Sequence, residues 1–129
     1  MEVFTRSVLA SVMGMTVNSI QPRAATRAGA TAGFIASVER RLPGTDCDVI
    51  HTFIPCVGAD IYQPRGGTVP ETIRRTIAAA RPGVGRSLKR WTMACNRRER
   101  MVLAKERVWL TGRSRPVVIA ISSYVARQL

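Results

Sequence analysis

Apolar residues recur every three or four positions in much of the chain, a spacing that puts their side chains on one face of a helix. The first example is Phe4, Val8 and Val12, and the same spacing returns in three later segments. Proline-glycine pairs at 43–44 and 82–83 mark places where helices commonly end. The pattern predicts helices over residues 2–16, 24–42, 68–80 and 86–111.

β-Branched and aromatic residues crowd together in two other regions. The first contains Pro55 and Gly58, which divide it into two short predicted strands, 48–54 and 56–62. The second predicts a buried strand over 117–125, after Pro116. The order helix, helix, strands, helix, helix, strand indicates an α+β fold with about four helices and a small sheet. A length of 129 residues fits a single compact domain, 1–129.

Individual residues refine the predicted helix ends. Thr68 and Glu71 have the spacing of a capping box, in which each side chain bonds the other residue's amide. Gly29 and Gly33 either weaken the helix at 24–42 or allow another backbone to approach it closely. Gly112 is expected to close the long helix at 86–111.

Charge is concentrated in one part of the chain. The whole sequence has 20 basic and 8 acidic residues, a net charge of +12, and 18 of the basic residues are arginine. Residues 63–116 contain 14 of the basic residues and only 3 of the acids. A concentrated positive surface attracts polyanions, and arginine suits phosphate because its planar fork donates two parallel hydrogen bonds.

The long predicted helix at 86–111 is basic and amphipathic. Its basic arc consists of Arg86, Lys89, Arg90, Arg97, Arg100 and Arg107. Its apolar side consists of Leu88, Trp91, Cys95, Val102 and Trp109, which we expect to be buried. Two acids of this helix, Glu99 and Glu106, lie away from the basic arc. We therefore expect these six residues, supported by Arg74 and Arg75, to bind nucleic acid through its backbone with little sequence specificity. The partner is RNA or DNA, with RNA as the expected form, and the sequence does not choose between them.

Other roles remain open at this point. The charged face could be simply solvated, or it could contact an acidic protein. The chain could be a structural subunit of a ribonucleoprotein, an organellar complex or a viral particle, or a metal-dependent nuclease. Trp91 and Trp109 could stack on unpaired bases instead of packing in the core. The number of apolar helical faces in so short a chain favours a homodimer.

Four residues make a candidate zinc site: Cys47, His51, Cys56 and Cys95. Tetrahedral zinc binds such Cys3His sets, but the paired C-x2-C spacing of zinc fingers is missing. The alternative is that the three cysteines are free thiols. We therefore expect no cofactor and keep zinc as the alternative. A P-loop is also missing, and no catalytic constellation stands out, so we do not expect an enzyme.

The rest of the composition bears on location. Three cysteines without regular spacing favour a reducing, intracellular compartment, the cytoplasm or nucleus. No apolar run approaches 18 residues, so we expect no membrane-spanning helix. Residues 1–45 are rich in Arg, Ala, Ser and Thr, which is typical both of a helical N-terminal segment and of a presequence for the mitochondrial matrix.

One stretch has a limited resemblance to a known family, and no resemblance covers the whole chain. Residues 83–90 (Gly-Val-Gly-Arg-Ser-Leu-Lys-Arg) and 96–100 (Asn-Arg-Arg-Glu-Arg) are similar to the basic run of small nucleic-acid-binding proteins encoded by filamentous plant viruses. In that family a four-cysteine finger follows the basic run, whereas this chain has only Cys95 nearby. The resemblance implies a small viral accessory protein that binds RNA.

Overall fold

The structure is a computed structural model of the chain, and it describes residues 1–6, 14–64, 66–113 and 115–128. These residues form an α+β fold with five helices, four of them of seven residues or more, and short strands, which confirms the predicted class. The elements are β1 (Glu2–Thr5), β2 (Thr16–Ser19), α1 (Arg27–Arg41), the 3-10 turn η1 (Leu42–Gly44), β3 (His51–Thr52), β4 (Ile61–Tyr62), α2 (Val69–Ala78), α3 (Val84–Cys95), α4 (Arg97–Thr111), β5 (Val117–Val118) and α5 (Ser123–Ala126).

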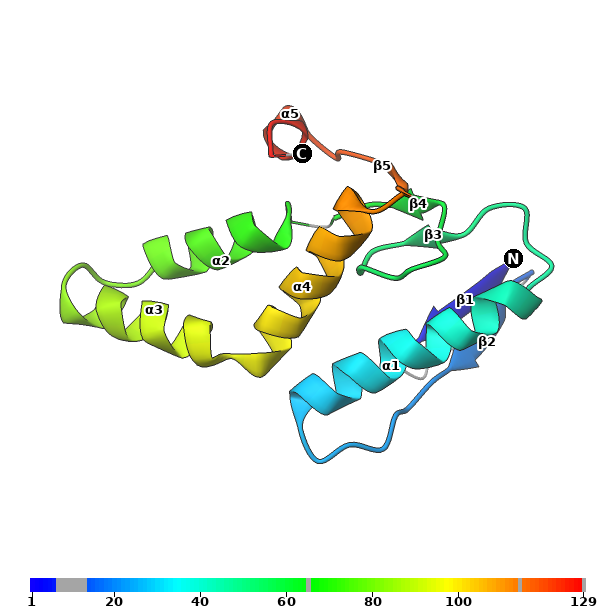
Figure 1. The fold of residues 1–129 in the computed structure, drawn as a ribbon, viewed down its shortest axis with the longest axis horizontal. Coiled ribbons are helices and arrows are strands. Elements are labelled where there is room, and N and C mark those ends of the chain that lie inside the picture. Colours follow the sequence, from blue (N-terminus) through cyan, green and yellow to red (C-terminus); the bar gives the residue numbers. More distant parts are fainter. Residues whose placement is uncertain (7–13, 65, 114, 129) are drawn as a thin grey trace.

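The strands form two small parallel sheets. β1 pairs with β2 in a register that sets Glu2 opposite Thr16. In the second sheet β4 lies between β3 and β5, and all three strands are parallel. Helices α2, α3 and α4 together form the connection from β4 to β5 (Figure 1).

The main core lies along α1. Val38 lies three residues after Ile35 and four after Phe34, and all three are buried, as the helical pattern requires. Ile20, Leu42 and Cys56 complete this cluster. A Cβ atom added to Gly33 would lie 2.9 Å from the Cβ of Pro22. Glycine here therefore permits a close approach of two chain segments, one of the two roles expected for it.

A second core joins α4 to the three-stranded sheet. The rings of Tyr62 and Trp109 lie with centroids 5.3 Å apart, and both residues are buried. Glu106, also on α4, is only 2% exposed. Its carboxylate accepts hydrogen bonds from the Tyr62 hydroxyl at 2.7 Å and from the Val69 amide at 2.9 Å. One side chain thus ties α4 to β4 and to the start of α2.

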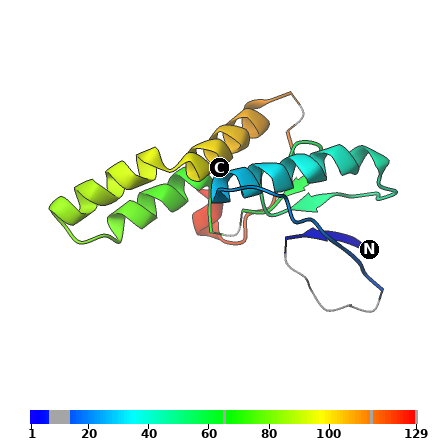
Figure 2. The ribbon, with the colours of Figure 1, turned by 90° about the horizontal axis from the view of Figure 1, so that it is seen from below.

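Helices α2 and α3 form a hairpin that extends away from α1 and the sheets (Figures 1 and 2). The hairpin turns at Gly83, whose φ of +81° lies in the region that favours glycine. The strand pair β1–β2 lies on the opposite part of the molecule, beside α1 (Figure 2).

The long helix predicted over 86–111 is two helices, and this prediction is corrected. Asn96 has a ψ of 101°, outside the helical range, and its side chain accepts hydrogen bonds from the amides of Arg98 and Glu99. Asparagine is among the best residues at a helix start because its side chain satisfies these first amides. The chain therefore ends α3 at Cys95 and starts α4 in a different direction (Figure 1).

The N-terminal helix predicted over 2–16 is also wrong for the residues that the structure describes. Residues 2–5 are strand β1, and Thr16 begins β2, because these two segments pair with each other. Residues 7–13 of that prediction lie outside the described residues. Among the described residues of the segment 1–45, helix is found at Arg27–Arg41, followed by the 3-10 turn Leu42–Gly44.

Two predictions near the third helix and the C-terminus also need correction. Thr68 does stand at the start of α2, but its side chain makes no capping bond. The reciprocal bond is also missing, because the Thr68 amide donates to Gln128 at 3.2 Å and the Glu71 carboxylate binds Arg74 and Tyr124 instead. The strand predicted over 117–125 is only the two residues of β5, followed by α5, which the side chain of Ser122 caps through the Val125 amide.

Candidate nucleic-acid interface

The outer side of α4 carries exposed arginines. Arg97, Arg100 and Arg107 lie on the side of the helix that faces solvent, opposite the buried Glu106 and Trp109. Among the described residues, none of these three arginines has an ion pair. The two faces predicted for this half of the segment are therefore present, and the basic one is open to a ligand.

The acids of α4 do not neutralise those arginines. Glu99 pairs with Arg98 at 2.7 Å, and the buried Glu106 is occupied by Tyr62 and Val69. No carboxylate in the described residues therefore competes with a phosphate for the outer arginines of α4.

Helix α3 carries basic residues too, but its apolar face is not buried. Lys89 and Arg90 have no ion pair in the described part of the chain, and an Arg86 Nη2 donates to the Ala78 carbonyl at 3.4 Å. Leu88 is 59% exposed and Trp91 66% exposed. Of the predicted apolar stripe only the α4 end reaches the core, because the turn at Asn96 directs α3 away from it. Trp109 is buried as expected, and Trp91 is not.

The arginines of α2 are partly engaged. Arg74 makes two hydrogen bonds of 2.6 Å to Glu71, which also accepts one from the Tyr124 hydroxyl. These hydrogen bonds lower the pKa of Glu71 from its ordinary value of 4.5 to about 2, and the bonds from Arg74 have the larger effect, followed by the bond from Tyr124. The Arg75 guanidinium lies 5.3 Å from the centroid of the Tyr124 ring. Arg75 keeps its charge available, while that of Arg74 is balanced.

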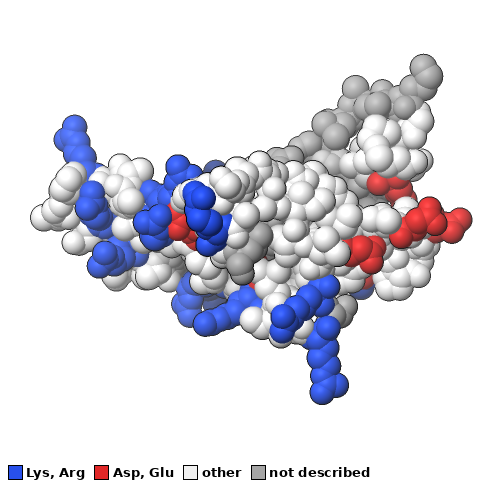
Figure 3. Space-filling view, turned by 90° about the horizontal axis from the view of Figure 1, so that it is seen from above, with Lys and Arg blue, Asp and Glu red and all other residues white. Residues whose placement is uncertain are grey.

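Taken together, the eight residues expected to bind nucleic acid lie on α2, α3 and α4, and we call them the basic surface: Arg74, Arg75, Arg86, Lys89, Arg90, Arg97, Arg100 and Arg107. Figure 3 shows many Lys and Arg side chains over the end of the molecule that α2 and α3 form, with an acid among them, and further Lys and Arg along the lower edge of the view. The other Asp and Glu side chains visible on this face lie toward the opposite end. The single straight ridge predicted from sequence is not formed, because the residues are divided between helices of different direction.

The candidate zinc ligands are not brought together. Cys56 is buried beside Glu39 and Lys105, whereas Cys47 and Cys95 are exposed. Burial, which has the larger effect, and the nearby Glu39 carboxylate raise the pKa of the Cys56 thiol to about 11. The thiol therefore remains protonated at neutral pH. Among the described residues no three His, Cys, Asp or Glu side chains are placed to hold a metal ion.

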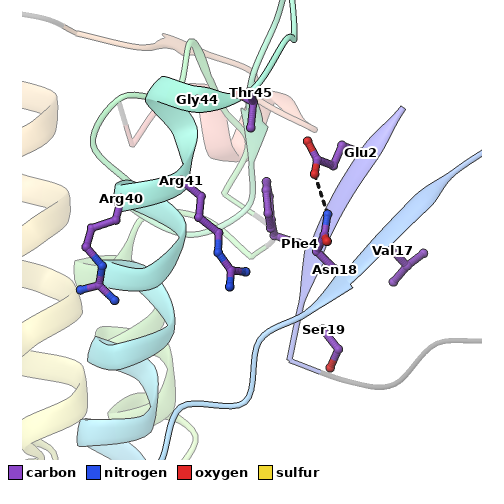
Figure 4. A pocket seen from close by; sticks show the side chains of 9 residues that line it. All are labelled: Glu2, Phe4, Val17, Asn18, Ser19, Arg40, Arg41, Gly44 and Thr45. Atoms are coloured by element: carbon purple, nitrogen blue, oxygen red, sulfur yellow. Dashed lines mark hydrogen bonds between the residues drawn. The ribbon is translucent and has the colours of Figure 1, made fainter.

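Two pockets lie at opposite ends of α1. One, of about 540 Å³, lies between the end of α1 and the β1–β2 pair. Figure 4 shows Arg40 and Arg41 on the helix across from Glu2, whose carboxylate accepts a hydrogen bond of 2.6 Å from Asn18. The helix and strand sides of this pocket thus carry opposite charges.

The other pocket, of about 960 Å³, lies where the starts of α1 and α4 meet the end of β1. Four arginines line it, Arg6, Arg27, Arg97 and Arg98, together with one acid, Glu99. Of these four, only Arg97 belongs to the basic arc predicted from sequence: Arg6 and Arg27 approach it only through tertiary contacts, and Arg98, the next residue, lies about 100° away around the helix. The available local signal was Asn96-x-x-Glu99, a typical helix start, which marks where α4 begins.

Comparison with protein-family models, curated proteins and solved structures finds no match to this chain. None of the helices in the described ranges has the length and apolar character needed to cross a membrane.

Proposed function

We propose that the chain binds nucleic acid, with RNA as the expected form, through the basic surface on α2, α3 and α4. The observation that carries this proposal is on α4, where Arg97, Arg100 and Arg107 are exposed without ion pairs in the described residues. Holding like charges together on a surface is unfavourable unless counterions or a polyanion neutralise them. A phosphate backbone supplies that neutralisation.

Backbone contacts define the expected mode of binding. Each guanidinium can donate two parallel hydrogen bonds to a phosphate, and such contacts position the ligand without reading its sequence. The exposed ring of Trp91 on α3 adds a stacking partner for an unpaired base, a contact that tolerates any base. The proposal therefore favours affinity for many sequences, with a strong dependence on salt concentration.

A gel-shift experiment with single- and double-stranded RNA and DNA, each at two salt concentrations, tests the proposal. We expect Arg97→Glu/Arg100→Glu to weaken binding of every sequence of the preferred type to a similar degree. Arg40→Glu/Arg41→Glu, an exposed pair at the far end of α1, is the matched control and should bind almost as well as the original chain. Equal losses in the two variants would show that binding does not depend on the basic surface. Loss of the probe after Mg²⁺ or Zn²⁺ is added, instead of a shift, would indicate a nuclease.

One observation favours a second candidate function, that of a subunit in a larger assembly. Val84 and Leu88 are 85% and 59% exposed, and with Trp91 they form an apolar stripe on α3 that no described residue covers. In a ribonucleoprotein or a particle, a neighbouring subunit would cover this stripe. Size-exclusion chromatography with light scattering distinguishes the two: a free RNA binder elutes as a small oligomer, whereas an assembly subunit elutes in large particles that Leu88→Glu disperses.

A further inference from the structure

The pocket between α1 and α4 brings together arginines that are far apart in the sequence. Arg6 follows β1, Arg27 begins α1, and Arg97 begins α4, yet all three line one pocket of about 960 Å³. They are exposed, and none has an ion pair among the described residues. Three segments of the fold thus direct uncompensated positive charge toward one hollow.

The fourth arginine of the pocket is fixed in place. The Arg98 Nε donates to the Thr31 hydroxyl at 3.2 Å, and Nη1 pairs with Glu99 at 2.7 Å. Thr31 is itself buried on α1 and donates to the Arg27 carbonyl. Arg98 therefore bridges α1 and α4 and holds the two sides of the pocket at a defined separation.

The charges of the pocket favour an anion. Its lining contains four arginines and one glutamate, a net charge of +3. A cleft lined by one sign of charge focuses the potential and concentrates ions of the opposite sign. The side chains of Thr26 and Asn96 accept hydrogen bonds from the amides of Gly29, Arg98 and Glu99, so these three amides are already engaged. The arginine side chains of the lining are the charged donors for a ligand, and their forks match a phosphate group.

The position and size of the pocket indicate which phosphate. A hollow of about 960 Å³ is much larger than a phosphate ion and is in the range of pockets that hold small organic molecules, so it has room for a whole nucleotide unit. Arg97 belongs both to this pocket and to the basic surface. A nucleic acid lying along α4 can therefore continue into the pocket without leaving the positive field.

We propose that Arg6, Arg27, Arg97 and Arg98 form a phosphate-binding pocket that receives a nucleotide unit of the nucleic acid bound on the basic surface. This inference rests on the proposed function. It adds a specific anchoring point, and it assigns a role to three arginines outside the basic surface.

The test uses Arg6→Gln/Arg27→Gln, which removes two pocket charges and leaves the basic surface intact. Arg40→Gln/Arg41→Gln removes the same charge at the other end of α1 and is the matched control. Pyrophosphate binding by calorimetry, compared between the two variants, isolates the contribution of the pocket, and fluorescence anisotropy with a labelled RNA over a salt series probes the nucleic acid. Far-UV circular dichroism verifies that both variants fold.

We expect the pocket variant to bind pyrophosphate at least ~10-fold more weakly. We also expect the slope of log K for RNA against log salt to become less steep by about 1.4–1.8, for two contacts at 0.7–0.9 each. The control should change neither value. Unchanged pyrophosphate binding in the pocket variant, or an equal loss in the control, would overturn the inference.

Two further outcomes separate this inference from the proposed function. If the pocket variant loses pyrophosphate but its RNA slope is unchanged, the pocket holds a free phosphorylated ligand, so the inference fails and the proposed function stands. If the original chain binds pyrophosphate but no nucleic acid, the proposed function fails, and with it the assignment of the pocket to a nucleic acid.

Discussion

Replacing Glu106 with glutamine tests how α4, and with it part of the basic surface, is held on the fold. Both carboxylate oxygens of Glu106 accept hydrogen bonds, from the Tyr62 hydroxyl and the Val69 amide, and the side chain is buried. Glutamine keeps one acceptor oxygen for the Val69 amide and turns its NH2 group toward the Tyr62 hydroxyl, which can accept from that group but then has no acceptor for its own hydrogen. One buried donor then loses its partner, which costs about 1–3 kcal/mol. Because domains of this kind have about 5–15 kcal/mol of stability in total, the loss is measurable.

Urea unfolding followed by far-UV circular dichroism measures this change in the free energy of unfolding. Glu99→Gln is the matched control, since it makes the same chemical change on the same helix, where the pair with Arg98 is partly exposed. Such pairs contribute at most about 1 kcal/mol. In a Tyr62→Phe background, Glu106→Gln should cost less, because only the Val69 amide still needs the carboxylate. A loss for Glu106→Gln no larger than that for Glu99→Gln would refute this account of the α4 anchor.

Three further predictions concern single side chains. The carboxyl of Glu71 should titrate near pH 2 by NMR, because its bonds to Arg74 and Tyr124 lower its pKa; the bonds to Arg74 persist at neutral pH and are lost as the pH falls through that value. Arg74→Gln should raise the midpoint of this titration toward 4.5, and an unchanged midpoint would count against the pair. A thiol reagent at pH 8 should label two cysteines in the folded protein and all three in urea, because Cys56 is buried and its pKa is about 11. Rapid labelling of all three cysteines in the folded protein would contradict the burial of Cys56. Iodide should quench the fluorescence of the exposed Trp91 but not that of the buried Trp109. In Trp91→Phe the remaining emission comes from Trp109 and should resist quenching, whereas ready quenching of this variant would contradict the burial of Trp109.

Sequence pattern was sufficient where local spacing and long-range packing agree. The helix predicted over 24–42 is found as α1, because the same spacing that places Phe34, Ile35 and Val38 on one face also buries them in the core. The division of α4 into a basic outer side and a buried inner side follows in the same way. In both helices the apolar side has a partner to cover it.

Sequence pattern failed where a tertiary contact or a single cap overrides periodicity. Residues 2–5 pair with residues 16–19, and a helical spacing of apolar residues cannot reveal such pairing. The apolar and basic spacing continues without interruption through Asn96, so periodicity predicted one helix, although Asn96-x-x-Glu99 has the form of a helix start. This break turns α3 away from the core and leaves Trp91 exposed.

The pocket of four arginines could not be found from the sequence. Arg6 and Arg27 lie in the part of the chain where basic and acidic residues are balanced, so the charge distribution gave them no prominence. They become part of a positive site only because α1 packs against α4 and the end of β1 lies close to both. Charge clustering along a chain identifies a basic surface, but packing decides which distant residues join it.

The salt dependence of RNA binding tests the central claim most directly. Five basic residues of α3 and α4 have neither an ion pair nor a side-chain hydrogen bond in the described residues, whereas Arg86 bonds the Ala78 carbonyl: Lys89, Arg90, Arg97, Arg100 and Arg107. If each neutralises one phosphate, these five residues contribute roughly −3.5 to −4.5 to the slope of log K against log salt, to which Arg6 and Arg27 of the pocket add about −1.4 to −1.8. Arg97→Gln/Arg100→Gln should make the slope less steep by about 1.4–1.8. At about 0.1 M salt that variant should bind about 25- to 60-fold more weakly, with little difference near 1 M. A flat slope for the original chain, or an unchanged slope for the variant, would contradict the claim that phosphate lies on the basic surface.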